Sequence, residues 1–187
     1  MASHQSAVSR KRRPPAGLGC VCLIARLAGS FAAAAPLPCD IFSAHSSPCV
    51  AAHSVVRALY ASYSGPLYSV KRRSDNATKF IGVLAAGGYA DSASQDDFCR
   101  GTSCIVQIIF DQSPRGNHLN TAPPGGNVPR PDRGVNASHS RLSVGGHPVY
   151  AAVFEGGMGY RNDNTSGVAT GDAPETMCES RASPFDL

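Results

Sequence analysis

Short apolar and alternating stretches mark the second third of this chain as strand-forming. The strongest runs from residue 104 to 110, is rich in β-branched residues and nearly uninterrupted, and so predicts a strand buried on both faces. Residues 67–71 alternate between apolar and polar side chains and predict a second strand. A turn at 74–76 followed by residues 79–84 completes a hairpin, and residues 148–154 predict a further strand.

Helical signals are fewer. Ser47 can cap a helix whose first residue is Pro48, and residues 49–61 contain no Gly or Pro and space their apolar side chains at nearly helical intervals. We therefore predict one helix over 49–61, ended by the turn residues 64–66. Residues 90–98 predict a second, shorter helix that is polar on one side.

The order of these elements favours a mainly β fold. Several short strands with one clear helix are typical of a β-sandwich, and residues 121–148, rich in Gly and Pro, predict an irregular excursion. The strands account for about half of such a sandwich, and no internal repeat is present. We therefore expect the strand at 104–110 to lack some partners and to leave an exposed apolar edge.

Composition narrows the class of protein. The 187 residues suit one domain, and a low charged fraction of 16% with 19 Gly and 14 Pro agrees with turn-rich β structure. No run of 18 uncharged apolar residues occurs, so no membrane partner is expected. The net charge of +4 arises at the N-terminus: five of the 17 basic residues precede residue 35, leaving 12 basic against 13 acidic residues. Nucleic acid is therefore not an expected partner.

The first 34 residues have the order of a secretory signal peptide. Residues 10–13 supply positive charge, 17–31 an apolar stretch and 32–35 small residues for cleavage. Arg26 interrupts the apolar stretch, so an incorrect start or a disordered basic arm are the alternatives. We predict a secreted, extracellular protein.

Cysteines and sequons agree with that compartment. Of seven cysteines, Cys20 and Cys22 lie in the predicted signal peptide, and Cys178 is left over when the others are paired. The other four cysteines can pair in three ways, and their spacing does not fit a zinc site. They are Cys39, Cys49, Cys99 and Cys104. Three N-glycosylation sequons begin at Asn76, Asn136 and Asn164 among polar or Gly-rich neighbours typical of surface loops.

The carboxylates present do not form an obvious catalytic pair. Asp96 and Asp97 would point apart on a helix, and Asp91, Asp111 and Asp172 lie in turn-like settings. Asp111 is expected to cap its own loop through side-chain to backbone hydrogen bonds.

The remaining candidates are isolated residues. Glu155 is the best single acid candidate, with a solvated strand end as the plainer interpretation, and His118 is expected to be structural. His spacing for a metal, a serine nucleophile elbow and nucleotide-binding glycine loops are all missing from the sequence. We therefore assign no catalytic, cofactor or metal residue.

A series of ordered motifs resembles one family of enzymes. The motifs begin with Cys-Asp-Ile at 39–41 and Pro-Cys-Val-Ala-Ala-His-Ser at 48–54, and they end with Ala-Thr-Gly-Asp-Ala at 169–173. The intervening matches lie at 57–60, 63–68, 86–91, 111–119, 122–126 and 159–162. Together they resemble the catalytic domain of the fungal α-L-arabinofuranosidase B family, glycoside hydrolase family fifty-four, over its N-terminal part.

The resemblance carries several implications. It implies a concanavalin-like, jelly-roll type β-sandwich present only in part, and disulfides Cys39–Cys49 and Cys99–Cys104. It implies release of terminal arabinofuranosyl groups from the plant cell-wall polysaccharides arabinan and arabinoxylan, with retention and without a cofactor. The nucleophile and the acid/base that retention requires lie further along the family's chain than residue 187.

The family pattern stops near residue 177. Residues 178–187 have no strand pattern, so we divide the chain into a signal peptide at 1–34, the family part at 35–177 and a divergent tail. We expect this chain to be a truncated and inactive glycosidase. The alternatives are a non-catalytic secreted sugar-binding or surface protein, or the product of a faulty gene model.

Overall fold

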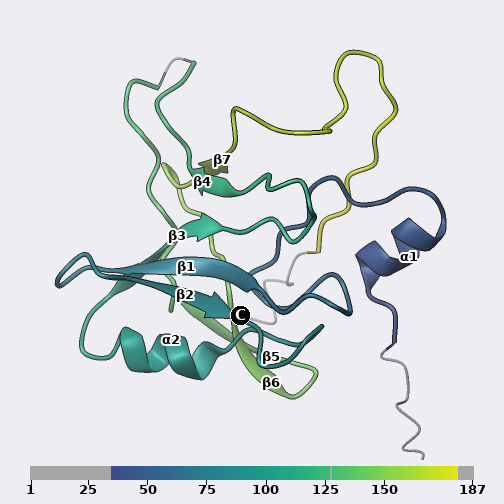
Figure 1. Ribbon diagram of the computed structural model, residues 1–187. Helices are drawn as coiled ribbons and strands as arrows, with labels where there is room; N and C mark the ends of the chain where they lie inside the picture. The colour runs from purple at the N-terminus through teal and green to yellow at the C-terminus, as the bar shows by residue number, and fades with distance from the viewer. Residues whose placement is uncertain (1–34, 127, 181–187) are drawn as a thin grey trace, which may run out of the picture. The chain divides into compact units, whose positions relative to one another are not determined.

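In the part of the chain that the structure describes, two antiparallel sheets and two short helices make up the fold. The computed structural model describes residues 35–126 and 128–180, and the signal peptide predicted at 1–34 lies outside these residues, as does much of the predicted tail. The helices are α1 (Pro38–Ala44) and α2 (Ser92–Phe98). One sheet has the strand order β2-β1-β3-β4-β7 and the other pairs β5 with β6 (Figure 1). The strands of the two sheets are β1 (Pro66–Arg72), β2 (Thr78–Gly82), β3 (Cys104–Ile109), β4 (Leu119–Thr121), β5 (Ser140–Val144), β6 (His147–Ala151) and β7 (Tyr160–Arg161).

The predicted hairpin is confirmed as β1 and β2. Tyr68 lies opposite Ile81, and Ser69 lies opposite Phe80. The turn between the strands is closed by Arg72, which donates two hydrogen bonds to the carboxylate of Asp75, at 3.0 and 2.6 Å. Hydrogen bonding from Arg72 is the main reason why the pKa of Asp75 falls to about 2.

β3 lies in the interior of the sheet. It pairs with β1 on one side, and on the other side with β4 and, at Ile105, with Asn136. The prediction that this strand leaves an exposed apolar edge is therefore wrong for the described residues, because chain segments later in the sequence cover its second edge.

Burial of β3 on both faces is also wrong. Cys104, Val106 and Ile109 are buried, whereas Ile105 is 39% exposed. A register shift against β1 leaves Gln107 as the extra residue of a bulge. The bulge explains why Val106 and Ile109, three positions apart, both face the core.

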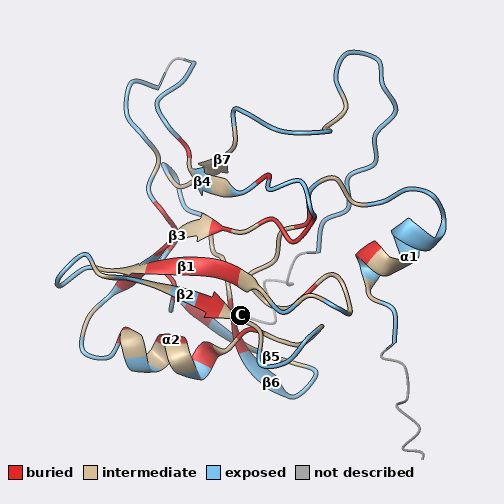
Figure 2. Cartoon of the chain, in the orientation of Figure 1, coloured by how far each residue is buried: buried red, intermediate tan, exposed pale blue. Residues whose placement is uncertain are grey.

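The core cluster joins residues of β1, β2, β3 and β6, and Figure 2 shows β1 as the most continuously buried strand. Tyr68, Val70 and Ile81 are essentially inaccessible to solvent, and Val149 of β6 belongs to the same cluster. Helix α2 contacts β2 and β6. Its Gln95 accepts a 2.7 Å hydrogen bond from the Tyr68 hydroxyl inside the core. The described chain is thus a partial β-sandwich.

The helix predicted at 49–61 does not form. Residues 45–65, which we call the 45–65 segment, contain neither helix nor strand. The first helix is α1 instead, with Pro38 in its first turn and the Asp40 carboxylate accepting the Leu37 N–H at 2.9 Å. The apolar side chains of the 45–65 segment satisfy helical spacing, but its backbone groups are bound by distant side chains, as described below.

The remaining elements differ from the predictions mainly in extent. The second helix begins at Ser92, with Asp91 capping it through the Ser94 N–H at 3.0 Å. The excursion predicted at 121–148 is irregular only in part, because it contains β5. β5 and β6 form a hairpin whose turn, Gly145-Gly146, has φ of +58° and +79°, values that glycine adopts without strain. Among the described residues, neither helix has the length and apolarity needed to span a membrane.

Candidate functional site

The loop after β3 is organised around the buried carboxylate of Asp111. Its Oδ1 accepts the backbone N–H groups of Ala52 at 2.8 Å and Ser113 at 2.9 Å. Its Oδ2 accepts the Ser113 hydroxyl at 2.6 Å and the Asn117 N–H at 2.8 Å. The prediction that Asp111 caps its own loop is therefore confirmed, and the bond to Ala52 extends that role to the 45–65 segment.

These hydrogen bonds determine the charge state of Asp111. Burial by itself would raise the pKa of the carboxyl group, but the hydrogen bonds from Ser113, Ala52 and Asn117 outweigh burial and hold the pKa below its ordinary value. Asp111 is thus a fixed carboxylate with no open coordination position. A group in this state stabilises the loop and is poorly suited to transfer protons.

Two histidines support the same loop. His118 Nδ1 accepts the backbone N–H of Asp111 at 3.0 Å, and the His118 ring contacts the edge of Phe110. His53 Nε2 donates to the carbonyl oxygen of Asn117 at 2.7 Å. The structural role predicted for His118 is confirmed, and His53 acts in the same way from the other segment.

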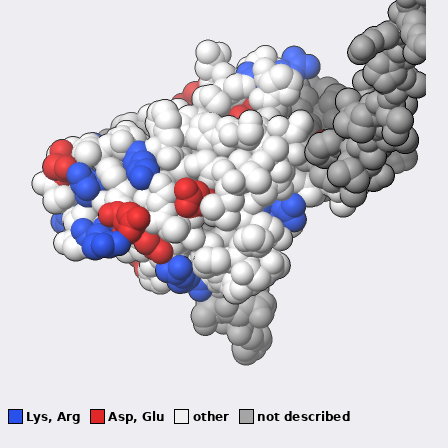
Figure 3. Space-filling model, turned by 60° about the horizontal axis from the view of Figure 1, so that its bottom comes forward, with Lys and Arg blue, Asp and Glu red and all other residues white. Residues whose placement is uncertain are grey.

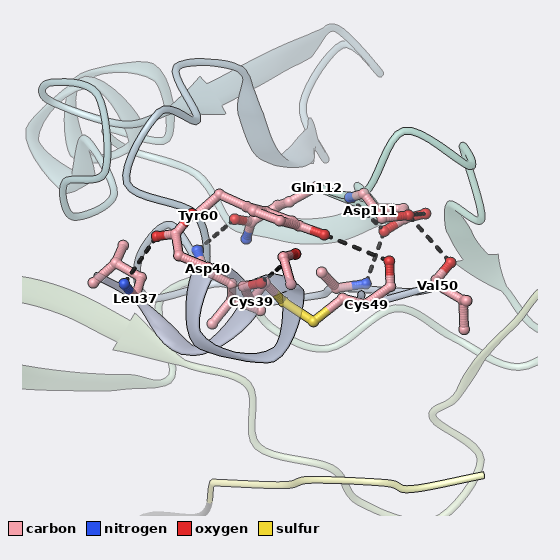
Figure 4. The surroundings of a disulfide bond; sticks show 12 residues. Leu37, Cys39, Asp40, Cys49, Val50, Tyr60, Asp111 and Gln112 are labelled. Atoms are coloured by element: carbon pink, nitrogen blue, oxygen red, sulfur yellow. Dashed lines mark hydrogen bonds between the residues drawn. A yellow bond between two sulfur atoms is a disulfide. The ribbon is translucent and has the colours of Figure 1, made fainter. Parts of the chain in front are cut away.

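The Cys39–Cys49 disulfide and Gln112 complete this region. Figure 4 shows the ring of Tyr60 between Gln112 and the disulfide. Gln112 Oε1 accepts the Leu59 N–H at 2.6 Å, and Asp40 accepts the Ala61 N–H at 2.8 Å. Side chains far away in the sequence therefore satisfy successive backbone groups of the 45–65 segment.

An open cavity of about 470 Å³ lies beside this region. It is lined by residues 60 and 62–65, before β1, and by residues 112–114, after β3. All of its lining side chains are uncharged, and two of them are tyrosines. This cavity is the candidate binding site of the described chain.

The other predicted carboxylates lie elsewhere and have structural partners or face solvent. Asp96 accepts hydrogen bonds from Arg141 at 2.9 Å and from the Tyr150 hydroxyl at 2.6 Å, whereas Asp97 pairs with Arg100. The two adjacent carboxylates thus have separate partners, which agrees with the prediction that they point apart on the helix. Glu155 and Asp172 are exposed.

Charge on the surface is mixed in sign. Figure 3 shows basic and acidic side chains side by side on one face. The structure contains the ion pairs Arg72–Asp75, Arg100–Asp97, Arg141–Asp96 and Arg161–Asp163. In the described part of the chain, no three His, Cys, Asp or Glu residues are grouped in a way that could hold a metal ion.

Cysteines and sequons have clear positions. The disulfides are Cys39–Cys49 and Cys99–Cys104, the pairing that the family resemblance implies, and Cys178 is free and exposed. The three sequon asparagines, Asn76, Asn136 and Asn164, are all exposed. Their exposure is compatible with N-glycosylation, which stays a prediction.

Sequence reasoning missed the residues of the cavity. The helix predicted over 49–61 includes Tyr60, and the turn predicted to end it begins at Ser64, so Tyr63 receives no role. A useful signal was present in the composition of 60–66, where tyrosines alternate with serines before Gly65-Pro66. Aromatic rings next to small hydroxyl groups are common in sites for neutral ligands.

Known proteins resemble this chain closely. Residues 38–182 match the family described as "Alpha-L-arabinofuranosidase B, catalytic". The chain is 55% identical to the probable α-L-arabinofuranosidase B of Aspergillus fumigatus and 53% identical to that of Aspergillus terreus, each over 144 residues. Those alignments cover 75% of this chain and 28% of each relative.

Solved structures give the same result. One is an arabinofuranosidase complexed with arabinofuranosyl-α-1,2-xylobiose, with a TM-score of 0.70 and 47% identity over 73% of this chain and 29% of that one. Another is a family fifty-four α-L-arabinofuranosidase soaked with a cyclic sulfate inhibitor, with a TM-score of 0.70 and 46% identity. The chain therefore spans less than a third of the length of these relatives. The family match nonetheless covers residues 38–182, and the chain belongs to the α-L-arabinofuranosidase B catalytic-domain family, a family of glycoside hydrolases.

Proposed function

We propose that this chain forms the N-terminal section of a catalytic domain that releases terminal α-L-arabinofuranosyl groups from arabinan and arabinoxylan with retention. The observation that carries the proposal is the family match over residues 38–182. A relative solved with arabinofuranosyl-α-1,2-xylobiose supports an arabinose-substituted xylan as one substrate.

The 187-residue chain by itself is proposed to lack this activity. Retaining hydrolysis needs two carboxyl groups about 5–5.5 Å apart, one acting as nucleophile and one as acid/base. Among the described carboxylates, Asp40, Asp91, Asp96 and Asp111 hold backbone or side-chain groups through hydrogen bonds. Each of these four supports the fold, and we propose that the reacting pair lies outside this chain.

A chimera tests both statements. The chain is compared with a fusion in which residues 1–177 continue into the corresponding downstream sequence of the Aspergillus fumigatus relative, using 4-nitrophenyl α-L-arabinofuranoside. We expect the fusion to release nitrophenol and the 187-residue chain to match the no-enzyme rate. An inactive fusion that is folded would contradict the proposed activity, and hydrolysis by the purified chain would contradict its inactivity. The anomer of the first-formed arabinose, observed by NMR, tests retention.

We also propose that the protein is secreted and N-glycosylated. Two disulfides and three exposed sequon asparagines support this location. Expression in a secreting yeast, followed by deglycosylation of the medium fraction, should lower the apparent mass, and replacing Asn76, Asn136 and Asn164 by Gln should abolish that change. Retention of the chain inside the cells with an unchanged mass would contradict it.

A non-catalytic sugar-binding protein is the second candidate. The observation that favours it is the open cavity of uncharged side chains beside Tyr60 and Tyr63. Saturable binding of a neutral oligosaccharide by a chain that does not hydrolyse it, together with an inactive chimera, would support this candidate over the first.

A further inference from the structure

The cavity beside the 45–65 segment has walls that are held in place without a ligand. The Tyr63 hydroxyl donates to the carbonyl oxygen of Pro66 at 2.5 Å, and the Tyr63 N–H donates to the carbonyl oxygen of Tyr60 at 3.1 Å. On the opposite wall, the N–H of Gln112 donates to the carbonyl oxygen of Ala52 at 2.8 Å. Both walls are therefore preorganised, which lowers the entropy lost when a ligand binds.

Gly65 sets the position of one aromatic ring. A Cβ atom at this position would lie 2.8 Å from the Tyr63 hydroxyl oxygen and 2.9 Å from the adjacent ring carbon. The ring thus lies directly over the glycine, and only a residue without a side chain allows that approach. Any larger residue at 65 would move the Tyr63 ring and so change the shape of the cavity.

The cavity also offers unused hydrogen-bonding groups. Ser62 and Ser64 are exposed, and within the described chain their hydroxyl groups have no partner. Gln112 donates from Nε2 to the Arg57 carbonyl oxygen only at 3.4 Å, although its Oε1 is firmly bound to Leu59. Each serine hydroxyl can donate one hydrogen bond and accept two.

The chemistry of the lining selects the ligand. No charged side chain lines the cavity, so an anionic or cationic ligand would enter it without a counter-charge. Tyrosine rings accept the apolar C–H face of a sugar ring, and neighbouring hydroxyl groups bind the sugar's own hydroxyls. The volume of the cavity, about 470 Å³, is within the range of small-ligand sites.

We propose that this cavity is a binding subsite for a short neutral pentose oligosaccharide, held by Tyr60 and Tyr63 through their rings and by Ser62 and Ser64 through their hydroxyls. The choice of a pentose rests on the proposed function, whereas the choice of a neutral sugar rests on the lining itself. The subsite is complete within residues 60–65 and 112–114 and requires no catalytic group.

Calorimetric titration of the 187-residue chain tests the proposal. The ligand is arabinofuranosyl-α-1,2-xylobiose, and a galacturonic acid trimer serves as an anionic comparison of similar size. We expect saturable binding of the neutral sugar alone. The double variant Ser62→Ala/Ser64→Ala should bind it about tenfold more weakly, since two hydrogen bonds are lost. Ser74→Ala, at an exposed serine of the β1–β2 turn, is the matched control and should bind normally.

Two further variants separate loss of the site from loss of the fold. Tyr63→Phe removes the hydroxyl that anchors the ring to Pro66, and Gly65→Ala displaces the ring, so each should weaken binding with an unchanged circular dichroism spectrum. Absence of saturable binding, equal binding of the anionic trimer, or wild-type affinity of the double serine variant would each overturn the proposal. Because the titration uses the 187-residue chain and the hydrolysis assay uses the chimera, binding without hydrolysis rejects only the proposed activity, and hydrolysis without binding rejects only this subsite.

Discussion

The hairpin β1–β2 and the 45–65 segment are held in place by different kinds of interaction. The hairpin buries Tyr68, Val70 and Ile81 against α2 and the second sheet, and its register follows from alternating side chains. The 45–65 segment has no regular secondary structure, and its backbone is bound by side chains such as Asp111 and Gln112, 59 and 53 residues away from their partners. Apolar burial therefore organises one region and a few directed polar contacts organise the other.

This difference has consequences for mutation. Apolar burial is spread over many contacts, so its loss depends on the volume removed. A buried polar contact depends on two atoms, and breaking it leaves the remaining partner without its hydrogen bond. The two regions should therefore respond differently to conservative substitutions, and the following predictions test that expectation.

The largest effect is expected in the hairpin. Ile81→Ala removes a fully buried side chain and should lower the free energy of unfolding by about 2–5 kcal/mol. Phe80→Ala is the matched control, because Phe80 is the neighbouring residue on the opposite face and is 63% exposed. Urea denaturation of both variants measures the contrast. Equal losses would mean that the face bearing Phe80 is as well covered as the core face.

Asp111→Asn should have the next largest effect. An amide cannot accept hydrogen bonds from every donor that surrounds the carboxylate. We therefore expect the free energy of unfolding to fall by about 2–3 kcal/mol near neutral pH. Asp91→Asn is the matched control, because asparagine also caps helices well and should cost little.

The pH dependence of the Asp111 variant gives a sharper test. The folded-state pKa of Asp111 lies below its value in the unfolded chain, near 3.9. The contribution of Asp111 to the free energy of unfolding is therefore present above that pH. It is lost as the pH falls through the lower, folded-state pKa. Wild type and Asp111→Asn should therefore converge in stability below about pH 4. A constant difference between them down to pH 2 would contradict the ionised state assigned to Asp111.

The same contrast explains which features could be predicted from the sequence. Strand periodicity and turn residues locate β1, β2 and β3, because local pattern and tertiary burial agree there. The Asp111 loop could be anticipated because aspartate binds backbone groups a few residues further on, here those of Ser113 and Asn117.

The failures have a common physical cause. The apolar residues at 50, 56, 59 and 60 satisfy helical spacing, but helix formation would withdraw the N–H groups that Asp111 and Gln112 bind. The bulge at Gln107 and the cover of β3 by residues near Asn136 depend equally on distant chain. The cavity beside Tyr63 is formed by two such segments, so it appears only when they are brought together.

A smaller effect is expected at Gln112. Gln112→Ala leaves the Leu59 N–H without its 2.6 Å acceptor and should cost about 1–2 kcal/mol. Gln107→Ala is the matched control, since Gln107 lies in the bulge and only accepts a 3.3 Å hydrogen bond from exposed Thr78. Hydrogen exchange should localise the change: Gln112→Ala should increase exchange in the 45–65 segment and leave β1 protected. Faster exchange in β1 instead would show that the two regions are not independently held.

The smallest effect is expected at Tyr160, whose hydroxyl makes directed polar contacts, like those that hold the 45–65 segment, inside the large sheet. The Tyr160 hydroxyl donates to the Val106 carbonyl oxygen at 2.7 Å and accepts the Val135 N–H at 2.9 Å. Gly134 permits this arrangement, because a Cβ there would lie 2.2 Å from the Val106 oxygen. Tyr160→Phe keeps the ring and should cost about 1 kcal/mol, less than Gln112→Ala because the surrounding β3 ladder stays intact.

Alkaline titration tests whether that hydroxyl stays protonated in the folded chain. Burial raises the pKa of Tyr160 to about 12, above its unfolded value near 10, so the protonated hydroxyl favours the folded chain. That contribution is complete below about pH 10 and is lost as the pH rises toward 12. The stability advantage of wild type over Tyr160→Phe, measured by urea denaturation, should therefore shrink across this range. Since the other tyrosines are common to both proteins, their titration cancels in the difference, and a pH-independent difference would contradict the raised pKa of Tyr160.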